Sequence, residues 1–377
     1  MIPLNKVYHA KNELSYITES ISSDSHSGDS RYSKACYEFL NNIYHRSYPL
    51  LTTSCTHSLE MSALMLRIKP GDEVIIPSFT FVSTANAFLM RGAKLIFCDS
   101  QQHSPNMDIQ HVKSLITNKT RIIVPVHYAG IACQMDELKN ITSVLNIKIV
   151  EDNAHGIGAY YKDDLLGSIG DLGCFSFHDT KNISCGEGGA ILINDKSLIS
   201  SGEIIREKGT DRSSFLRGEV DKYGWKELGS SYLLSDILAA RLLSQLEDLD
   251  FIIERRKELW NYYYEILSPL RDKEAIELPE IPNYASHSGH IFYILCKNYD
   301  LRDLLIKHLK NKGIQSAFHY RSLHKSEYFI NKYEGIELIN ADRYSNCLLR
   351  LPLYPDLGND QVNFITDEIF SFFKCNS

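Results

Sequence analysis

The 377-residue sequence lacks the short motifs that mark several familiar kinds of site. Its nine cysteines are an odd number and contain no CxxC pair, so they indicate neither a disulfide framework nor a zinc site. Its 14 histidines form no HExxH or HxH motif, and the turn GEGG does not have the GxxxxGK[ST] frame of a P-loop. We therefore expect no metal site and no P-loop nucleotide site.

An excess of positive charge and long apolar runs are also lacking. The formal net charge is −7, which argues against nucleic acid or an anionic membrane surface as a partner. No uninterrupted apolar run is long enough to span a bilayer, and the opening stretch MIPLNKVYHAKNEL has no signal-peptide core. The sequence predicts a soluble, cytoplasmic protein.

The first half of the chain alternates β-rich runs with helical patterns, which is typical of βαβ units and a parallel sheet with helices on both faces. Two further strand-like runs, 173–178 and 188–195, flank Lys181. The earlier strand-like runs are 73–78, 93–100, 120–130 and 147–156, and helical patterns cover 58–68 and 83–92.

The pattern changes near residue 234. Residues 235–267 form one helical pattern without glycine or proline, which predicts either one helix that bridges two domains or two helices end to end. A strand is expected at HIFYILC (290–296) and an amphipathic helix at LRDLLIKHLKNKGI (301–314). We predict an α/β large domain over residues 1–245 with a mostly parallel sheet, and a smaller α+β domain over 246–377.

The stretch FSFHDTKNISCGEGG (175–189) places one lysine, Lys181, between an apolar run and a glycine-rich turn. Such a lysine can form a Schiff base with a carbonyl if burial and nearby positive charge lower the pKa of its amine. Ser176 lies upstream, where its hydroxyl could reach a phosphate, and the glycines let the backbone pass close to a bulky group. An ordinary surface lysine is the alternative.

The motif EDNAH (151–155) follows a very apolar strand, at the edge where open α/β sheets bind ligands. A buried Asp152 would need a cation or a strong donor beside it. A protonated pyridine nitrogen is such a partner, and the aspartate would keep that ring an electron sink. A capping aspartate after a strand explains the motif equally well.

Two further segments could contact a cofactor. TTSCTHS (52–58), before a helix, offers donors to a phosphate, although a plain N-cap also explains it. PSFTFVSTANA (77–87) offers Phe79 or Phe81 to stack on a flat heterocycle, although a core aromatic is the simpler explanation. The order of phosphate turn, aromatic, aspartate and Ser…Lys is the signature of a fold-type I pyridoxal phosphate (PLP) enzyme.

Six segments together resemble the DegT/DnrJ/EryC1/StrS family of nucleotide-sugar aminotransferases. They are TTSCTHSLEMSAL, GDEVIIPSFTFVSTANAFLMRGAK, VPVHYAG, VEDNAHG, GCFSFHDTKNISCGEGG and REKGTDRSSFLRGEVDKYGW, and the resemblance runs from residue 2 to the C-terminal region. It implies an aspartate aminotransferase-like, fold-type I PLP-dependent transferase. It also implies a homodimer with shared active sites.

The resemblance implies a role for each matching residue. Lys181 is expected to be the Schiff-base lysine and proton shuttle, and Asp152 the partner of the pyridine nitrogen. Where many members carry Gly-x-Asn-x-Arg this chain has GSSYL (229–233), so Ser231 replaces the Asn that reaches the partner subunit's phosphate. The other expected cofactor contacts are Cys55, Thr56 and Ser176 at the phosphate, Phe81 on the ring, and His155 at the ring face or its 3-hydroxyl.

Substrates also follow from the resemblance. The amino group of L-glutamate is expected to pass to C4 of dTDP-4-keto-6-deoxyglucose, giving dTDP-4-amino-4,6-dideoxygalactose. This sugar would enter a surface polysaccharide such as lipopolysaccharide O-antigen or enterobacterial common antigen. The residues expected at the substrate are Arg212, Lys222, Tyr223, His319 and Tyr320, the first three in a mixed-charge segment (206–226) that a solvated loop also explains.

Three alternatives stay open at this point. The same chemistry could give dTDP-4-amino-4,6-dideoxyglucose or a 3-amino sugar, because single side chains around the sugar decide the outcome. A non-catalytic regulatory binding protein is a more distant alternative, which would not need Lys181, Asp152 and Ser176 together.

Overall fold

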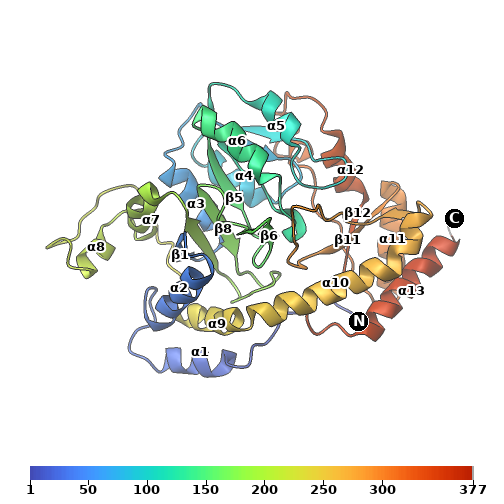
Figure 1. The fold of residues 1–377 in the computed structure, drawn as a ribbon, viewed down its shortest axis with the longest axis horizontal. Coiled ribbons are helices and arrows are strands. Elements are labelled where there is room, and N and C mark those ends of the chain that lie inside the picture. The colour runs from blue at the N-terminus through green and yellow to red at the C-terminus, as the bar shows by residue number, and fades with distance from the viewer. Residues whose placement is uncertain (376–377) are drawn as a thin grey trace.

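Buried runs of aliphatic residues form a seven-stranded central sheet in the computed structural model, which describes residues 1–375 (Figure 1). The strand order is β1-β9-β8-β5-β4-β2-β3. Strands β2, β3, β4, β5 and β8 run parallel, whereas β9 is antiparallel to β8 and β1. The predicted mostly parallel sheet is confirmed. The strands are β1 (Tyr48–Thr52), β2 (Glu73–Pro77), β3 (Lys94–Cys98), β4 (Thr120–Ile123), β5 (Lys148–Asp152), β8 (Leu172–Ser176) and β9 (Gly189–Ile193).

Two differences from the sequence expectations have physical explanations. Strand β4 ends at Ile123, well before the end of the run expected over 120–130, and the chain then turns through a 3-10 helix at Tyr128–Gly130. Strand β1 was not expected, since its short run YPLLT contains Pro49. Proline cannot donate to a strand partner, and β1 lies at the edge of the sheet, where proline is tolerated.

Helices cover both faces of the central sheet, because neighbouring strand residues point to opposite sides. Leu50 packs with Leu59 on one face, whereas Leu51 packs with Leu40 on the other. Each such side chain contributes roughly 1.5–3 kcal/mol through burial. The first face carries α3 (Cys55–Met65) and α4 (Val82–Leu89), and the second carries α2 (Arg31–Ile43), α5 (Ile109–Leu115), α6 (Met135–Leu145) and α9 (Asp236–Glu247).

A second, three-stranded antiparallel sheet lies beyond the central one. The predicted strand at 290–296 and helix at 301–314 are confirmed as β11 and α11. Ile2, near the start of the chain, packs into the hydrophobic core around this second sheet. The division at residues 245 and 246 stays a prediction. The elements here are β10 (Ile276–Glu277), β11 (Phe292–Cys296), β12 (Leu348–Leu351), α11 (Tyr299–Asn311), α12 (Ile339–Cys347) and α13 (Asn359–Cys375).

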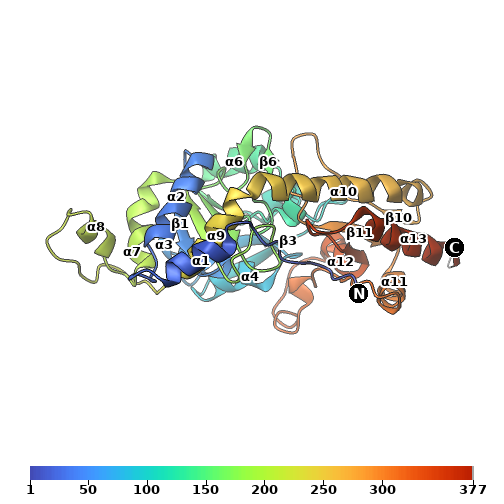
Figure 2. The same cartoon turned by 90° about the horizontal axis from the view of Figure 1, so that it is seen from below.

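The long helical pattern at 235–267 proves to be two helices end to end. Helix α9 ends at Glu247 and α10 (Leu249–Asp272) begins after Asp248. Figures 1 and 2 show α10 running from the central sheet to the three-stranded sheet. Its first half packs against the central sheet through Ile252, and its second half packs in the core around the three-stranded sheet through Tyr263.

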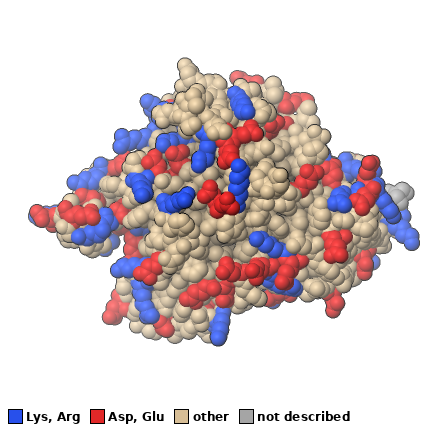
Figure 3. All heavy atoms as spheres, in the orientation of Figure 1, with Lys and Arg blue, Asp and Glu red and all other residues tan. Residues whose placement is uncertain are grey.

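The segment around α8 (Arg212–Leu216), which follows α7 (Ile199–Arg206), projects from one end of the molecule (Figures 1 and 2). On the face drawn in Figure 3, basic and acidic side chains are interspersed. None of the helices within residues 1–375 combines the length and apolar character that crossing a bilayer needs. The remaining elements are α1 (Glu13–Ile21), β6 (Tyr160–Tyr161) and β7 (Asp164–Leu165).

Arg256, on α10, ties this helix to the segment that leads into β11 and to the segment that follows β12. Its buried guanidinium donates to the carbonyls of Gly289, His290 and Leu353 at 3.1, 3.0 and 3.0 Å. We expect Arg256→Met to lower the free energy of unfolding by about 3 kcal/mol, because three buried carbonyls lose a charged donor. Denaturant unfolding measures this, and Arg271→Met on the exposed end of α10 is the control, with an expected change within about 0.5 kcal/mol.

Candidate active site

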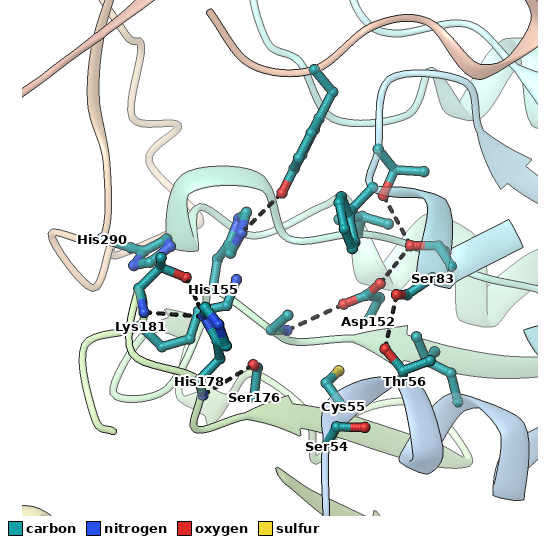
Figure 4. A pocket seen from close by; sticks show the side chains of 18 of the residues that line it. Ser54, Cys55, Thr56, Ser83, Asp152, His155, Ser176, His178, Lys181 and His290 are labelled. Atoms are coloured by element: carbon teal, nitrogen blue, oxygen red, sulfur yellow. Dashed lines mark hydrogen bonds between the residues drawn. The ribbon is translucent and has the colours of Figure 1, made fainter. Parts of the chain in front are cut away.

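A cavity of about 560 Å³ opens at the carboxyl edge of the central sheet. Strands β5 and β8 are neighbours and end at Asp152 and Ser176, so both side chains reach this edge. The cavity is also lined by the first turn of α3 and by residues from the three-stranded sheet region. Figure 4 shows Lys181 and His290 on one side of it and the α3 turn on the other.

Lys181 lies in the loop between β8 and β9, and its side chain forms part of the cavity wall. The loop is held by its own backbone, since Lys181 N–H donates to the His178 carbonyl at 2.9 Å and Phe177 N–H donates to Gly188 at 2.8 Å. Burial lowers the pKa of the Lys181 amine from its usual range to about 8. The amine therefore has a neutral, nucleophilic fraction near neutral pH that an exposed lysine lacks.

Asp152 ends β5 with its carboxyl buried in the same cavity. Burial raises the pKa of this carboxyl, while donated hydrogen bonds from Thr84 and Ala154 oppose the rise. The Thr84 hydroxyl lies 2.7 Å from Oδ2, and the Ala154 N–H lies 3.3 Å from Oδ1. A cationic nitrogen beside the carboxyl would relieve the cost of this buried charge.

The neighbouring residue Glu151 points to the other side of β5 and fixes the strand end. Its carboxylate accepts from the backbone N–H groups of Gly167, Ile169 and Gly170 at 2.8, 2.7 and 2.6 Å. It also pairs with the fully buried His127 at 2.9 Å, which helps to raise the pKa of His127 to about 10 against the opposing effect of burial. Because Glu151 is the neighbour of Asp152 in the chain, these bonds also fix the position of Asp152 at the end of the central sheet.

Helix α3 presents its N-terminus to the cavity through Cys55 and Thr56, three residues earlier than the pattern at 58–68 indicated. Ser54 caps the helix and accepts from the His57 N–H at 3.1 Å. A side chain at Gly189 would bring its Cβ to 2.4 Å from the carbonyl carbon of Ser54, so glycine allows β9 to approach this turn. Free N–H groups of a helix end, with Ser176 close by, form a suitable phosphate cradle.

Two histidines on the cavity wall have defined tautomers. The Ala129 N–H donates to Nδ1 of His155 at 3.3 Å, which leaves the proton on Nε2, 3.4 Å from the Tyr320 hydroxyl. Nδ1 of His290 lies 2.8 Å from the side-chain amide oxygen Oδ1 of Asn182, which accepts its proton. Burial holds the pKa of both histidines well below the usual range, so they are neutral.

The structure brings most of the predicted site residues together. Of the two stacking candidates, Phe81 lines the cavity, whereas Phe79 is buried in the core. The predicted residues that line the cavity are Cys55, Thr56, Phe81, Asp152, His155, Ser176, Lys181, His319 and Tyr320. Four others do not line it: Arg212, Lys222, Tyr223 and Ser231 belong to or adjoin the projecting segment, and their roles stay predictions.

Four contributors escaped the sequence analysis: Thr84, Asn182, His290 and Arg350. His290 opens the run HIFYILC, where a histidine directly before a buried strand was the available signal. Nothing in the sequence near Arg350 sets it apart from an exposed strand residue. The set as a whole fits PLP, since it offers an amine for the aldehyde, a carboxyl for the ring nitrogen, an aromatic face and a phosphate cradle.

The lowered pKa of Lys181 predicts a stability effect in cofactor-free protein. Unfolded Lys181 takes up its proton below its usual pKa of 10.5 and the folded form only below about 8, so the free energy of unfolding falls as the pH drops from 10.5 to 8 and stays lowered below pH 8. We expect Lys181→Met to raise the free energy of unfolding at pH 7 by about 2 kcal/mol. This value is smaller than the full pKa shift would give, because solvent in the open cavity screens the charge. Denaturant unfolding between pH 7 and 10.5 should show the difference shrinking as pH rises.

Comparison with known proteins shows the family of the chain. The model of the DegT/DnrJ/EryC1/StrS aminotransferase family matches residues 8–370. MJ1066 of Methanocaldococcus jannaschii, itself uncharacterized, is 31% identical over 333 residues, which are 86% of each chain. Spr1654 from Streptococcus pneumoniae, described as a sugar aminotransferase in its PMP-form, has a TM-score of 0.89 at 25% identity over 99% of each chain.

NtdA from Bacillus subtilis, with bound cofactor PMP, has a TM-score of 0.87 at 26% identity, covering 97% of this chain and 82% of that one. These structures share the fold from end to end, and the family model spans nearly the whole chain. The chain therefore belongs to the DegT/DnrJ/EryC1/StrS aminotransferase family and is a PLP-dependent sugar aminotransferase.

Proposed function

We propose that this enzyme transfers the amino group of L-glutamate to C4 of dTDP-4-keto-6-deoxyglucose, giving dTDP-4-amino-4,6-dideoxygalactose for a surface polysaccharide. The observation that carries the amino-transfer chemistry is the burial of both Lys181 and Asp152 in the wall of one cavity. The resemblance of the six sequence segments supports the choice of sugar. Lipopolysaccharide O-antigen and enterobacterial common antigen are the candidate destinations.

Lys181 has two tasks in this reaction. With a pKa of about 8, roughly a tenth of its amine is neutral at pH 7, enough to act as a nucleophile and then as a proton carrier. Bound PLP supplies an electron sink for the carbon that gains or loses that proton. Asp152 holds a proton at the ring nitrogen, and Thr84 orients its carboxyl by hydrogen bonding to Oδ2.

His155 completes the contacts around the ring. Because its Nδ1 is occupied by the Ala129 N–H, its Nε2 proton points into the cavity as a donor. A neutral donor there can hold the 3-hydroxyl oxygen of the ring without adding a charge beside Lys181. His319 and Tyr320 form the adjoining wall, where we place the sugar.

A homodimer would bring the remaining predicted residues to a site. The projecting segment carries Arg212, Lys222 and Tyr223 and exposes apolar side chains, with Trp225 82% exposed and Leu216 67% exposed. Exposed apolar groups gathered on one segment are typical of protein–protein contact. We propose that this segment, together with Ser231, reaches the partner subunit's cavity, where its basic residues meet the two phosphates of the dTDP-sugar.

The amino-transfer step can be tested with the purified protein loaded with PLP. We expect L-glutamate to bleach the long-wavelength absorbance of the bound cofactor, and dTDP-4-keto-6-deoxyglucose to restore it. Lys181→Ala should lose the absorbance band and all turnover, because no other amine of the cavity can take its place. Turnover retained in that variant would contradict the role of Lys181, and no response to glutamate in the native protein would contradict the function.

The identity of the product needs a separate measurement. We expect NMR of the aminated sugar to show an axial amine at C4, as in the galacto configuration. An equatorial amine would assign the gluco product, and nitrogen at C3 would assign a 3-amino sugar. The same sample without L-glutamate is the control and should contain unchanged keto sugar.

A further inference from the structure

Arg302, on α11, is a buried arginine that has no partner for its charge. The residue is only 4% exposed, and in the described part of the chain no hydrogen bond or ion pair engages its guanidinium. Its Nε and Nη1 atoms are both buried without an acceptor. Removing a guanidinium from water without an anion is costly, so we expect an anion from solution to complete it.

Two aromatic rings hold the guanidinium in place. Its central carbon Cζ lies 4.9 Å from the centre of the Tyr299 ring and 5.5 Å from the centre of the Phe318 ring. Such contacts stabilise the positive charge, but a ring face is a poor substitute for the oxygen acceptors that guanidinium N–H groups prefer. The donors of Arg302 are therefore positioned and still available.

The guanidinium forms part of the wall of a pocket of about 330 Å³ between α11, α12 and the chain that connects them. Ser322 adds a second unsatisfied group to this wall, since the residue is 3% exposed and its Oγ has no partner in the described structure. The pocket is separate from the active-site cavity, because the two sets of lining residues have no member in common. The lining residues are Tyr299, Arg302, Asp303, Phe318, Arg321, Ser322, Lys325, Asp342, Ser345 and Asn346.

The acidic residues of the pocket are already paired with other cations. Asp303 is near enough to feel the charge of the buried guanidinium, but its carboxylate binds Lys307 at 2.9 Å. The carboxylate of Asp342 binds Lys325 at 2.6 Å. Arg321 is a further cation of the wall and has no ion pair within the described residues. An anion that enters the pocket therefore meets two arginines without carboxylate partners.

The pocket shares one chain segment with the active site. His319 and Tyr320 line the active-site cavity, whereas Phe318, Arg321 and Ser322, their neighbours in the chain, line the pocket. An ion bound by Arg302 and Ser322 would therefore restrain the backbone that carries His319 and Tyr320 into the active site.

We propose that this pocket binds a phosphate-like oxyanion through Arg302 and Ser322, as a second ligand site separate from the active site. A planar guanidinium donates two parallel hydrogen bonds to such an anion, and the serine hydroxyl can donate a third. A tetrahedral phosphate keeps further oxygens and a second negative charge for Arg321, which favours phosphate over a singly charged carboxylate. We expect free phosphate as the ligand, because the diphosphate of the sugar nucleotide enters the active-site cavity.

The first test measures thermal unfolding of PLP-loaded enzyme, in which the phosphate of the cofactor already occupies the α3 turn. Without added phosphate, Arg302→Met should unfold at the native temperature or above it, because it removes a buried charge that has no partner. About 10 mM phosphate at constant ionic strength should raise the unfolding temperature of the native enzyme by about 2 °C or more and leave Arg302→Met unchanged. Arg271→Met, on the exposed end of α10, is the control and should respond as the native enzyme does.

The second test measures binding by calorimetry with inorganic phosphate and, separately, with dTDP. We expect the dissociation constant for phosphate to rise about tenfold or more in Arg302→Met and about threefold in Ser322→Ala. Arg302→Lys keeps the charge without the fork and should fall between the native enzyme and Arg302→Met. The dissociation constant for dTDP should change by less than about threefold in all three variants.

Hydrogen exchange locates the bound ion. In the native PLP-loaded enzyme, phosphate should slow the exchange of backbone amides in residues 318–323, and this protection should be lost in Arg302→Met. Protection at the α3 turn without any at 318–323 would place the ion in the active site and overturn the proposal.

Three further results would overturn the proposal. Arg302 has only a packing role if Arg302→Met is much less stable than the native enzyme in phosphate-free buffer and still binds phosphate as tightly. A loss of dTDP affinity as large as the loss of phosphate affinity would assign the pocket to the substrate's diphosphate. Native enzyme that shows no response to phosphate in any of the three measurements has no such site.

Discussion

Burial of a lysine and an aspartate in one cavity is the constraint on which this structure depends. Removing both from water lowers the pKa of the Lys181 amine and raises the pKa of the Asp152 carboxyl. The lowered pKa gives Lys181 a neutral, nucleophilic fraction, whereas the buried carboxyl of Asp152 is stabilised by a cationic partner. A cofactor with an aldehyde at one position and a basic ring nitrogen at another satisfies both residues, and this fit connects the fold to amino transfer.

The central sheet supplies the half of the site whose backbone is held by buried hydrogen bonds. Strand β5 delivers Asp152, while the adjacent Glu151 binds three backbone N–H groups and His127 on the opposite side of the strand. Because successive residues of a strand point to opposite faces, one carboxylate anchors the strand end and the next faces the ligand. The glycine at position 189 lets β9 and the α3 turn approach closely enough to form one cradle.

The three-stranded sheet region supplies the other side of the cavity, where we place the substrates. His290, His319, Tyr320 and Arg350 all come from this region, and α10 connects it to the central sheet. Arg256 fastens α10 to the backbone at His290, so packing of the helix and position of the histidine are linked. Neutral histidines around Lys181 line the cavity without adding charge beside its amine.

The sequence by itself determined the parts of the protein that local patterns encode. Strand ends such as EDNAH, the lone Lys181 before a glycine-rich turn, and the alternation of strands and helices all lie within short windows. Together they indicated the fold and the cofactor, and the resemblance of six longer segments indicated the family. Only the tertiary structure decided that Phe81 rather than Phe79 faces the cavity, that 235–267 is two helices, and that Thr84, His290 and Arg350 join the site. The physical reason is distance along the chain: Thr84 meets Asp152 across 68 residues, and such contacts arise from packing rather than from periodicity.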